Sequence, residues 1–166
     1  MKTVVWCFTL LLFYLCIACQ PQANSAVTPP ASELKQPIQP DETAIKQDIT
    51  KVLDEQAAGW NEGSIDKYME GYEKSDSVRF ASGGNVTYGW QTVLDRYKKG
   101  YADKAAMGRL TFSEIDIKVL KEDTALVFGR WLLERAKDQP QGLFTLLFRK
   151  TSAGWRIVHD HTSAKQ

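Results

Sequence analysis

The chain has 166 residues, with 21 lysines and arginines against 20 aspartates and glutamates, so its formal net charge is +1. This balance supplies no basic surface for nucleic acid or for anionic membrane, and we expect neither to bind the folded part of the chain. All three cysteines lie among the first 19 residues. The rest of the chain therefore cannot be cross-linked by disulfide bonds and must be stabilised by an apolar core.

Residues 1–18 have the composition of an export signal. Lys2 precedes a nearly unbroken apolar run from Val4 to Ala18, which is short for a membrane span; a single anchor helix is the alternative. The pair Ala18-Cys19 resembles the lipobox of bacterial lipoproteins. That resemblance implies that residues 1–18 are a signal peptide, that Cys19 is lipidated, and that the exported protein is anchored at the bacterial cell envelope. Secretion after ordinary cleavage is the alternative.

Residues 19–40 are rich in proline, glutamine, serine and alanine and contain few apolar side chains. Such a segment cannot bury enough surface to offset its conformational entropy, and we expect a flexible tether. A tether would let a lipid-anchored domain stand away from the bilayer. The chain from Asp41 onward is long enough for one compact domain.

The first half of this domain is predicted to contain three helices. Asp41 can cap the first, whose apolar residues recur at three- and four-residue steps from Ile45 to Trp60. Ser64 can cap a short second helix, and Gly89 leads into the third. Residues 77–88 are typical of a small hairpin that turns at two glycines.

The second half is predicted to form four antiparallel strands, separated by turn signals. Their approximate ranges are 110–120, 124–133, 143–148 and 155–161. Residues 143–148 are apolar on both faces, which favours a central strand that is covered on each side. Long strands after a helical start indicate an α+β domain, with helices packed on one face of a curved sheet.

Four stretches of sequence resemble the nuclear transport factor 2-like superfamily and, within it, the SnoaL-like branch. They are Gln56–Ser64, Gly84–Trp90, Gly142–Lys150 and Gly154–Ser163, and the resemblance covers residues 41–163. It implies a cone, in which a curved, mixed or antiparallel sheet wraps around three N-terminal helices and leaves a pocket at its open end. Members include isomerases, dehydratases, cyclases, binding proteins and association domains, so the resemblance leaves activity open.

The only two histidines, His159 and His161, lie one residue apart on the last predicted strand. Residues two apart on a strand point the same way, so both should share the face of Trp155 and Ile157 and look into the pocket; a bulge would break this inference. His161 is then the candidate catalytic base of an isomerase, dehydratase or cyclase. Alternatively, His161 hydrogen-bonds inside the fold and His159 lines the pocket without reacting. We expect no metal, because further ligands are missing, and no cofactor, because no binding fingerprint appears.

The number of aromatic residues favours a pocket for a small apolar or aromatic molecule. Arg130 or Arg79 could neutralise an anionic group, although strand alternation allows only one of Arg130 and Trp131 to face inward. A homodimer that pairs through the open sheet face is a further hypothesis, which the apolar strand 143–148 supports. The candidate ligand-binding residues are Trp60, Tyr68, Tyr72, Tyr88, Trp90, Trp131, His159, His161 and Arg130.

Overall fold

The computed structural model describes residues 41–165. The predicted signal peptide (1–18), the predicted tether (19–40) and the candidate lipidation site Cys19 lie outside the described residues. Within residues 41–165, no helix is both long and apolar enough to cross a membrane.

The helices begin where the sequence predicts. The Asp41 side chain accepts hydrogen bonds from the backbone N–H groups of Thr43 and Ala44, both at 3.1 Å, and starts α1 (Glu42–Glu62). Gly63 ends α1 in the left-handed conformation, at φ 90°, which glycine adopts without strain. The Ser64 side chain then caps the short α2. The remaining elements of the helical layer are α2 (Ile65–Met69), α3 (Trp90–Gly100) and α4 (Lys104–Met107).

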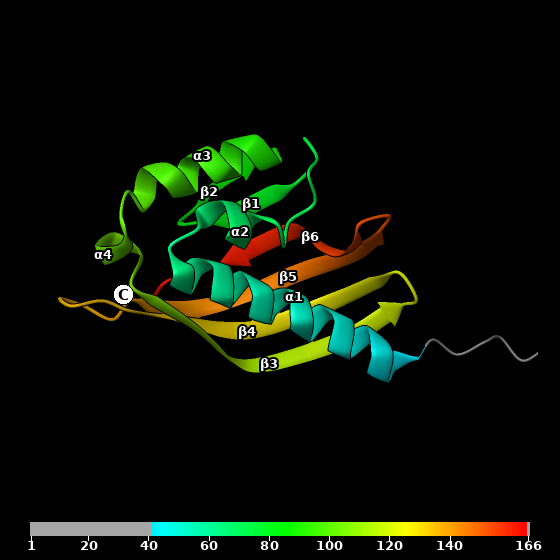
Figure 1. Cartoon of the computed structure of the whole chain (residues 1–166). Coiled ribbons are helices and arrows are strands. Elements are labelled where there is room, and N and C mark those ends of the chain that lie inside the picture. The colour runs from blue at the N-terminus through cyan, green and yellow to red at the C-terminus, as the bar shows by residue number, and fades with distance from the viewer. Residues whose placement is uncertain (1–40, 166) are drawn as a thin grey trace, which may run out of the picture. The chain divides into compact units, whose positions relative to one another are not determined.

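Six strands form one mixed sheet in the order β2-β1-β6-β5-β4-β3. The β1–β6 pair is parallel, and the other pairs are antiparallel. In Figure 1, α1 lies across one face of the sheet and α3 lies beside β1 and β2. The predicted α+β class is therefore confirmed, with the short α4 as an addition. The strands are β1 (Arg79–Ser82), β2 (Asn85–Tyr88), β3 (Arg109–Lys121), β4 (Thr124–Glu134), β5 (Gln141–Thr151) and β6 (Gly154–Thr162).

The core lies between the helices and the face of the sheet that they cover, here called the inner face. On β5 the inner side chains Phe144, Leu146 and Phe148 are buried, whereas Leu143 and Leu147 on the opposite, outer face are half-buried. The prediction of a central strand is confirmed, since β5 pairs with β4 and β6. The expected coverage of β5 on both faces is not found: within residues 41–165, only its inner face is covered.

A bulge in β6 reverses the alternation of its side chains. Ile157 is opposite Phe148, but His159 is opposite Leu147, so Val158 is an extra residue in β6. On its other edge, Ile157 bonds to the backbone around Tyr72, and β6 continues beside β1 from His159 onward. Because one extra residue turns every later side chain to the other face, residue 160 points inward and residues 159 and 161 point outward.

Candidate functional site

The inner face and the helices enclose a cavity with a volume of about 460 Å³. Its wall is mainly aromatic and aliphatic, with a few polar groups, which is the usual composition of a small-molecule site. The lining side chains include Trp60, Tyr68, Tyr72, Phe80, Arg96, Tyr97, Tyr101, Trp131, Arg135 and Asp160.

Asp160 is the one carboxylate among the residues that line this cavity. It is only 4% exposed, and it lies between Phe80 of β1 and Leu146 of β5 in the strand register. The Tyr72 hydroxyl donates to Oδ2 of Asp160 at 2.6 Å, whereas the buried Oδ1 has no hydrogen-bond partner within residues 41–165. Buried polar atoms are rarely left in this state, so Oδ1 is a vacant acceptor, which a ligand reaches once a side chain that covers it moves.

Burial raises the pKa of Asp160 to about 7, and the hydrogen bond from Tyr72 opposes part of that rise. The carboxyl group therefore exchanges its proton near neutral pH. Most surface aspartates are ionised at this pH, so the difference comes from the apolar surroundings of Asp160. A group with this property in a cavity can act as a general acid or base.

Three tyrosines surround this end of the cavity. The hydroxyls of Tyr68 and Tyr97 are 3.4 Å apart, and the ring centroids of Tyr68 and Tyr72 are 6.0 Å apart. Burial, and next the charge of Asp160, raises the pKa of Tyr68 and of Tyr72; for Tyr97 burial again dominates. All three phenols stay protonated at neutral pH; the hydroxyl of Tyr72 donates to Asp160, and those of Tyr68 and Tyr97 can donate to a bound oxygen.

Helix α1 extends this aromatic wall through its last turn, where Trp60 packs against Tyr68, with ring centroids 5.1 Å apart. Trp60 donates from Nε1 to the backbone oxygen of Met107 at 3.2 Å, and its ring meets Tyr101 edge to face, with centroids 4.7 Å apart. Gly59 permits this arrangement because a Cβ there would lie 2.6 Å from the Cβ of Lys67 in α2. The close contact of α1 and α2 thus depends on the glycine before Trp60.

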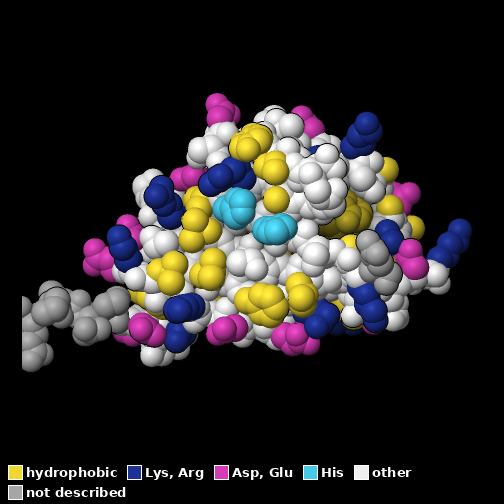
Figure 2. Space-filling view, turned by 180° about the vertical axis from the view of Figure 1, so that it is seen from behind, with side chains coloured by type: hydrophobic (Ala, Val, Ile, Leu, Met, Phe, Trp, Pro, Cys, Tyr) yellow, Lys and Arg dark blue, Asp and Glu magenta, His cyan; other side chains and the backbone are white. Residues whose placement is uncertain are grey.

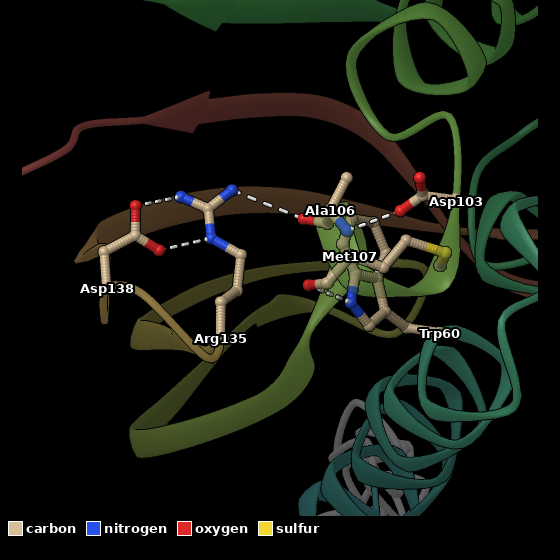
Figure 3. A network of polar contacts seen from close by, with 6 residues as sticks. All are labelled: Trp60, Asp103, Ala106, Met107, Arg135 and Asp138. Atoms are coloured by element: carbon tan, nitrogen blue, oxygen red, sulfur yellow. Dashed lines mark hydrogen bonds and ion pairs between the residues drawn. The ribbon is translucent and has the colours of Figure 1, made fainter.

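The rim beside Trp60 is held by a polar network around α4 (Figure 3). Asp103 caps α4 by accepting from the backbone of Ala106 at 2.8 Å. Arg135 donates to both carboxylate oxygens of Asp138, at 2.6 and 2.9 Å, and to the backbone oxygen of Ala106 at 3.3 Å. Arg135 therefore ties the end of β4 to α4, and its charge is balanced by Asp138.

Four of the predicted ligand-binding residues line the cavity, namely Trp60, Tyr68, Tyr72 and Trp131. Whether they contact a ligand stays a prediction.

Three others lie elsewhere, so their predicted position is wrong. Tyr88 is 60% exposed on the edge strand β2. Trp90 bonds to the backbone of Met69, and its ring lies 5.0 Å from the amino group of Lys74. Arg130 forms a two-bond ion pair with Glu114, and Trp131 is the one of the two neighbours that faces inward.

The prediction that both histidines look into the pocket is also wrong. His161 is exposed and His159 is half-buried, and Figure 2 shows the two imidazoles side by side on the outer face of the sheet. The bulge at Val158 is the cause, since it exchanges their face with that of Asp160. Burial, followed by the charges of Arg79 and His161, lowers the pKa of His159.

The sequence interpretation missed Asp160 because unbroken alternation placed it away from the histidines. Tyr97 and Tyr101 were expected on the inner face of the third helix, and their four-residue spacing could have identified them as cavity residues. Arg96 carried no signal of its own. In the part of the chain that the structure describes, no group of three histidines, cysteines or carboxylates could hold a metal ion.

A mixed sheet, a helical layer on one face and an aromatic cavity closed by a buried acid define a small α+β domain of the nuclear transport factor 2-like type. The chain belongs to the SnoaL-like domain family, whose sequence model matches residues 49–165. The resemblance noted in the sequence is thereby confirmed. None of the curated proteins matches this chain.

Solved structures agree with this assignment. A nuclear transport factor 2-like protein of unknown function from Shewanella oneidensis is 42% identical, with a TM-score of 0.69, and the match covers 72% of this chain and 98% of that one. A superfamily protein from Salmonella enterica is 18% identical, with a TM-score of 0.60 over 75% and 94%. A protein of unknown function with a cystatin-like fold from Nostoc punctiforme is 12% identical, with a TM-score of 0.58 over 72% and 90%. The last two show the fold alone.

Proposed function

We propose that this domain binds a small, largely apolar molecule that carries at least one hydrogen-bonding oxygen, and that it does so without a cofactor. The observation that carries the proposal is the buried, unpartnered Oδ1 of Asp160, for which residues 41–165 supply no donor. A ligand hydroxyl would satisfy it. The aromatic wall would bury the rest of the molecule.

Proton transfer is the second candidate function, and the pKa of about 7 at Asp160 favours it. In that case the domain is an isomerase, dehydratase or cyclase in which Asp160, and not His161, moves the proton. The phenols of Tyr68 and Tyr97 would stabilise charge on the substrate oxygen by donating hydrogen bonds, while the hydroxyl of Tyr72 donates to Asp160. Such chemistry requires two groups with different proton affinities at one end of a cavity, here the carboxyl of Asp160 and the tyrosine hydroxyls.

One experiment separates these functions from each other. A panel of small aromatic alcohols and enones is titrated into the purified full-length chain, and binding is followed by calorimetry and turnover by absorbance. Asp160→Asn should weaken hydroxyl-bearing ligands by roughly tenfold, because the amide cannot replace a charged acceptor. The matched control is His161→Ala, which alters a neighbour on the outer face and should change neither reading.

Binding without turnover supports the ligand-binding function. Turnover that Asp160→Asn abolishes and His161→Ala preserves supports the enzyme. Equal ligand affinity in wild type and Asp160→Asn, with turnover absent from both or equal in both, would contradict both.

We also propose that two copies pair through the outer face of the sheet. Exposed and half-buried apolar side chains gather there on β4 and β5, and Leu126 and Phe128 are 36% and 40% exposed. Sedimentation of the full-length chain, in mild detergent, tests this pairing. Phe128→Glu should turn the dimer into a monomer, because paired copies would bury a charge at this position. A wild-type monomer at high concentration would contradict the proposal.

For the location of the protein we propose export and anchoring through a lipid on Cys19. Support comes from the apolar run that ends at Ala18-Cys19. Cells that express wild type or Cys19→Ser are fed labelled palmitate. Label is expected on the wild-type protein and not on the variant. Equal labelling of the two proteins, or none, would remove the lipid anchor.

A further inference from the structure

Two arginines line the same cavity as Asp160. Arg96 reaches it from α3, and Arg135 reaches it from the end of β4. The charges of both lower the pKa of Tyr101 against the larger opposing effect of burial. An otherwise aromatic cavity thus has an acid in one part of its wall and cationic groups in another.

The two guanidinium groups differ in what balances their charge. Arg135 is held by the two bonds to Asp138 described above (Figure 3). Arg96 donates to the Thr87 hydroxyl at 3.0 Å and lies 4.8 Å from the centroid of the Phe80 ring. Within residues 41–165 it forms no ion pair with a carboxylate. The cavity wall therefore carries one uncompensated positive charge.

The positive charge of Arg96 is not paired with the carboxyl of Asp160. Phe80 lies opposite Asp160 in the strand register, and Arg96 stacks on the ring of Phe80. Burial raises the pKa of Asp160 against the opposing bond from Tyr72, and Arg96 forms no ion pair with that carboxyl. A second anion beside Asp160 would be repelled, whereas an anion at Arg96 would gain a charge-assisted bond.

We propose that the ligand is a small monocarboxylate with an aromatic or alicyclic body, whose carboxylate binds Arg96 and whose other end reaches Asp160. The inference rests on the proposed function and names its ligand class. One uncompensated guanidinium matches one negative charge, and the planar fork of arginine accepts a carboxylate through two parallel bonds. The rings of Phe80, Tyr97 and Tyr101 bury the body between the two ends.

Matched acids and amides test the proposal. Calorimetry on the full-length chain compares 6-hydroxy-2-naphthoate with 6-hydroxy-2-naphthamide and 4-hydroxycinnamate with 4-hydroxycinnamamide, since each pair carries a hydroxyl for Asp160 and differs in charge and hardly in shape. In wild type each carboxylate should bind roughly tenfold more tightly than its amide, which is the low end for a charge-assisted bond at a partly exposed arginine. The advantage should shrink when the salt concentration is raised.

Two variants assign the effect. Arg96→Gln should abolish the preference for the acid and leave amide affinity unchanged. Arg79→Gln is the matched control, because Arg79 is an exposed arginine on the outer face, and it should keep the preference intact.

The results distinguish failure of the carboxylate proposal from failure of the ligand-binding function. Equal affinity of acid and amide in wild type, or a preference that survives Arg96→Gln, overturns the carboxylate proposal and leaves the ligand-binding function standing. Binding by neither acids nor amides overturns both.

Discussion

The two faces of β6 give neighbouring residues opposite environments. Asp160 points inward and is 4% exposed, whereas His161, next to it in sequence, is exposed on the outer face. The inner face removes the carboxyl from water and raises its pKa to about 7, close to the value of an ordinary histidine. In this domain, therefore, burial makes an aspartate the group that titrates near neutral pH in the cavity.

The largest expected effect contrasts the two faces on β5. Phe148→Ala removes a fully buried ring from the inner face and should lower the free energy of unfolding by about 3–5 kcal/mol. Leu147→Ala, its neighbour on the outer face, should cost at most about 1 kcal/mol, because Leu147 is only half-buried. Urea denaturation measures both. Equal losses would show that the outer face is covered as well, as it would be in a dimer.

Asp160→Asn is expected to make the protein more stable above neutral pH. The folded protein keeps the Asp160 proton up to about pH 7, whereas the unfolded chain releases it near pH 4. The free energy of unfolding of the wild type should therefore fall as pH rises between these values. The variant lacks this loss, and at pH 8 it should be more stable by roughly 2–4 kcal/mol.

Thermal denaturation at pH 4 and at pH 8 provides the measurement. The two proteins should differ little at pH 4, where Asp160 is protonated in the folded state and only begins to lose its proton in the unfolded state. A difference that does not change with pH would mean that Asp160 is not the group that titrates.

Tyr72→Phe removes the hydroxyl that donates to Asp160. Because this hydrogen bond lowers the pKa of Asp160, its loss should raise that pKa further. A buried acceptor left without its donor should also reduce the free energy of unfolding by about 1–2 kcal/mol. The carboxyl carbon signal of labelled Asp160, followed by NMR through a pH titration, reads the pKa directly. A pKa unchanged or lower in the variant would contradict the bond.

The smallest effect is expected on the outer face. His161→Ala changes an exposed side chain, so the free energy of unfolding should stay within about 0.5 kcal/mol of wild type. Ligand affinity should be unchanged, because the imidazole lies outside the cavity wall. Denaturation and calorimetry check both expectations. A tenfold loss of ligand affinity would restore the histidine to the site and refute the orientation of β6.

Local sequence determined the elements and the class of the fold. Asp41, Ser64 and Gly63 mark helix ends through their own side chains or backbone freedom, and the apolar spacing in α1 and α3 marks their inner faces. The inward position of Trp60 follows from this spacing in α1. These signals act over a few residues, which is why they can be read without a tertiary structure.

Only the tertiary structure decided which chemistry faces the cavity. The bulge at Val158 arises where β6 meets the segment around Tyr72 and then β1 on the edge opposite β5, and both of these partners are remote in sequence. Since strand side chains alternate with a period of two, one extra residue exchanges an acid for two imidazoles. The charge of Arg96 was likewise hidden, because its neighbours, and its lack of a carboxylate partner among the described residues, depend on how α3 packs beside β1 and β2.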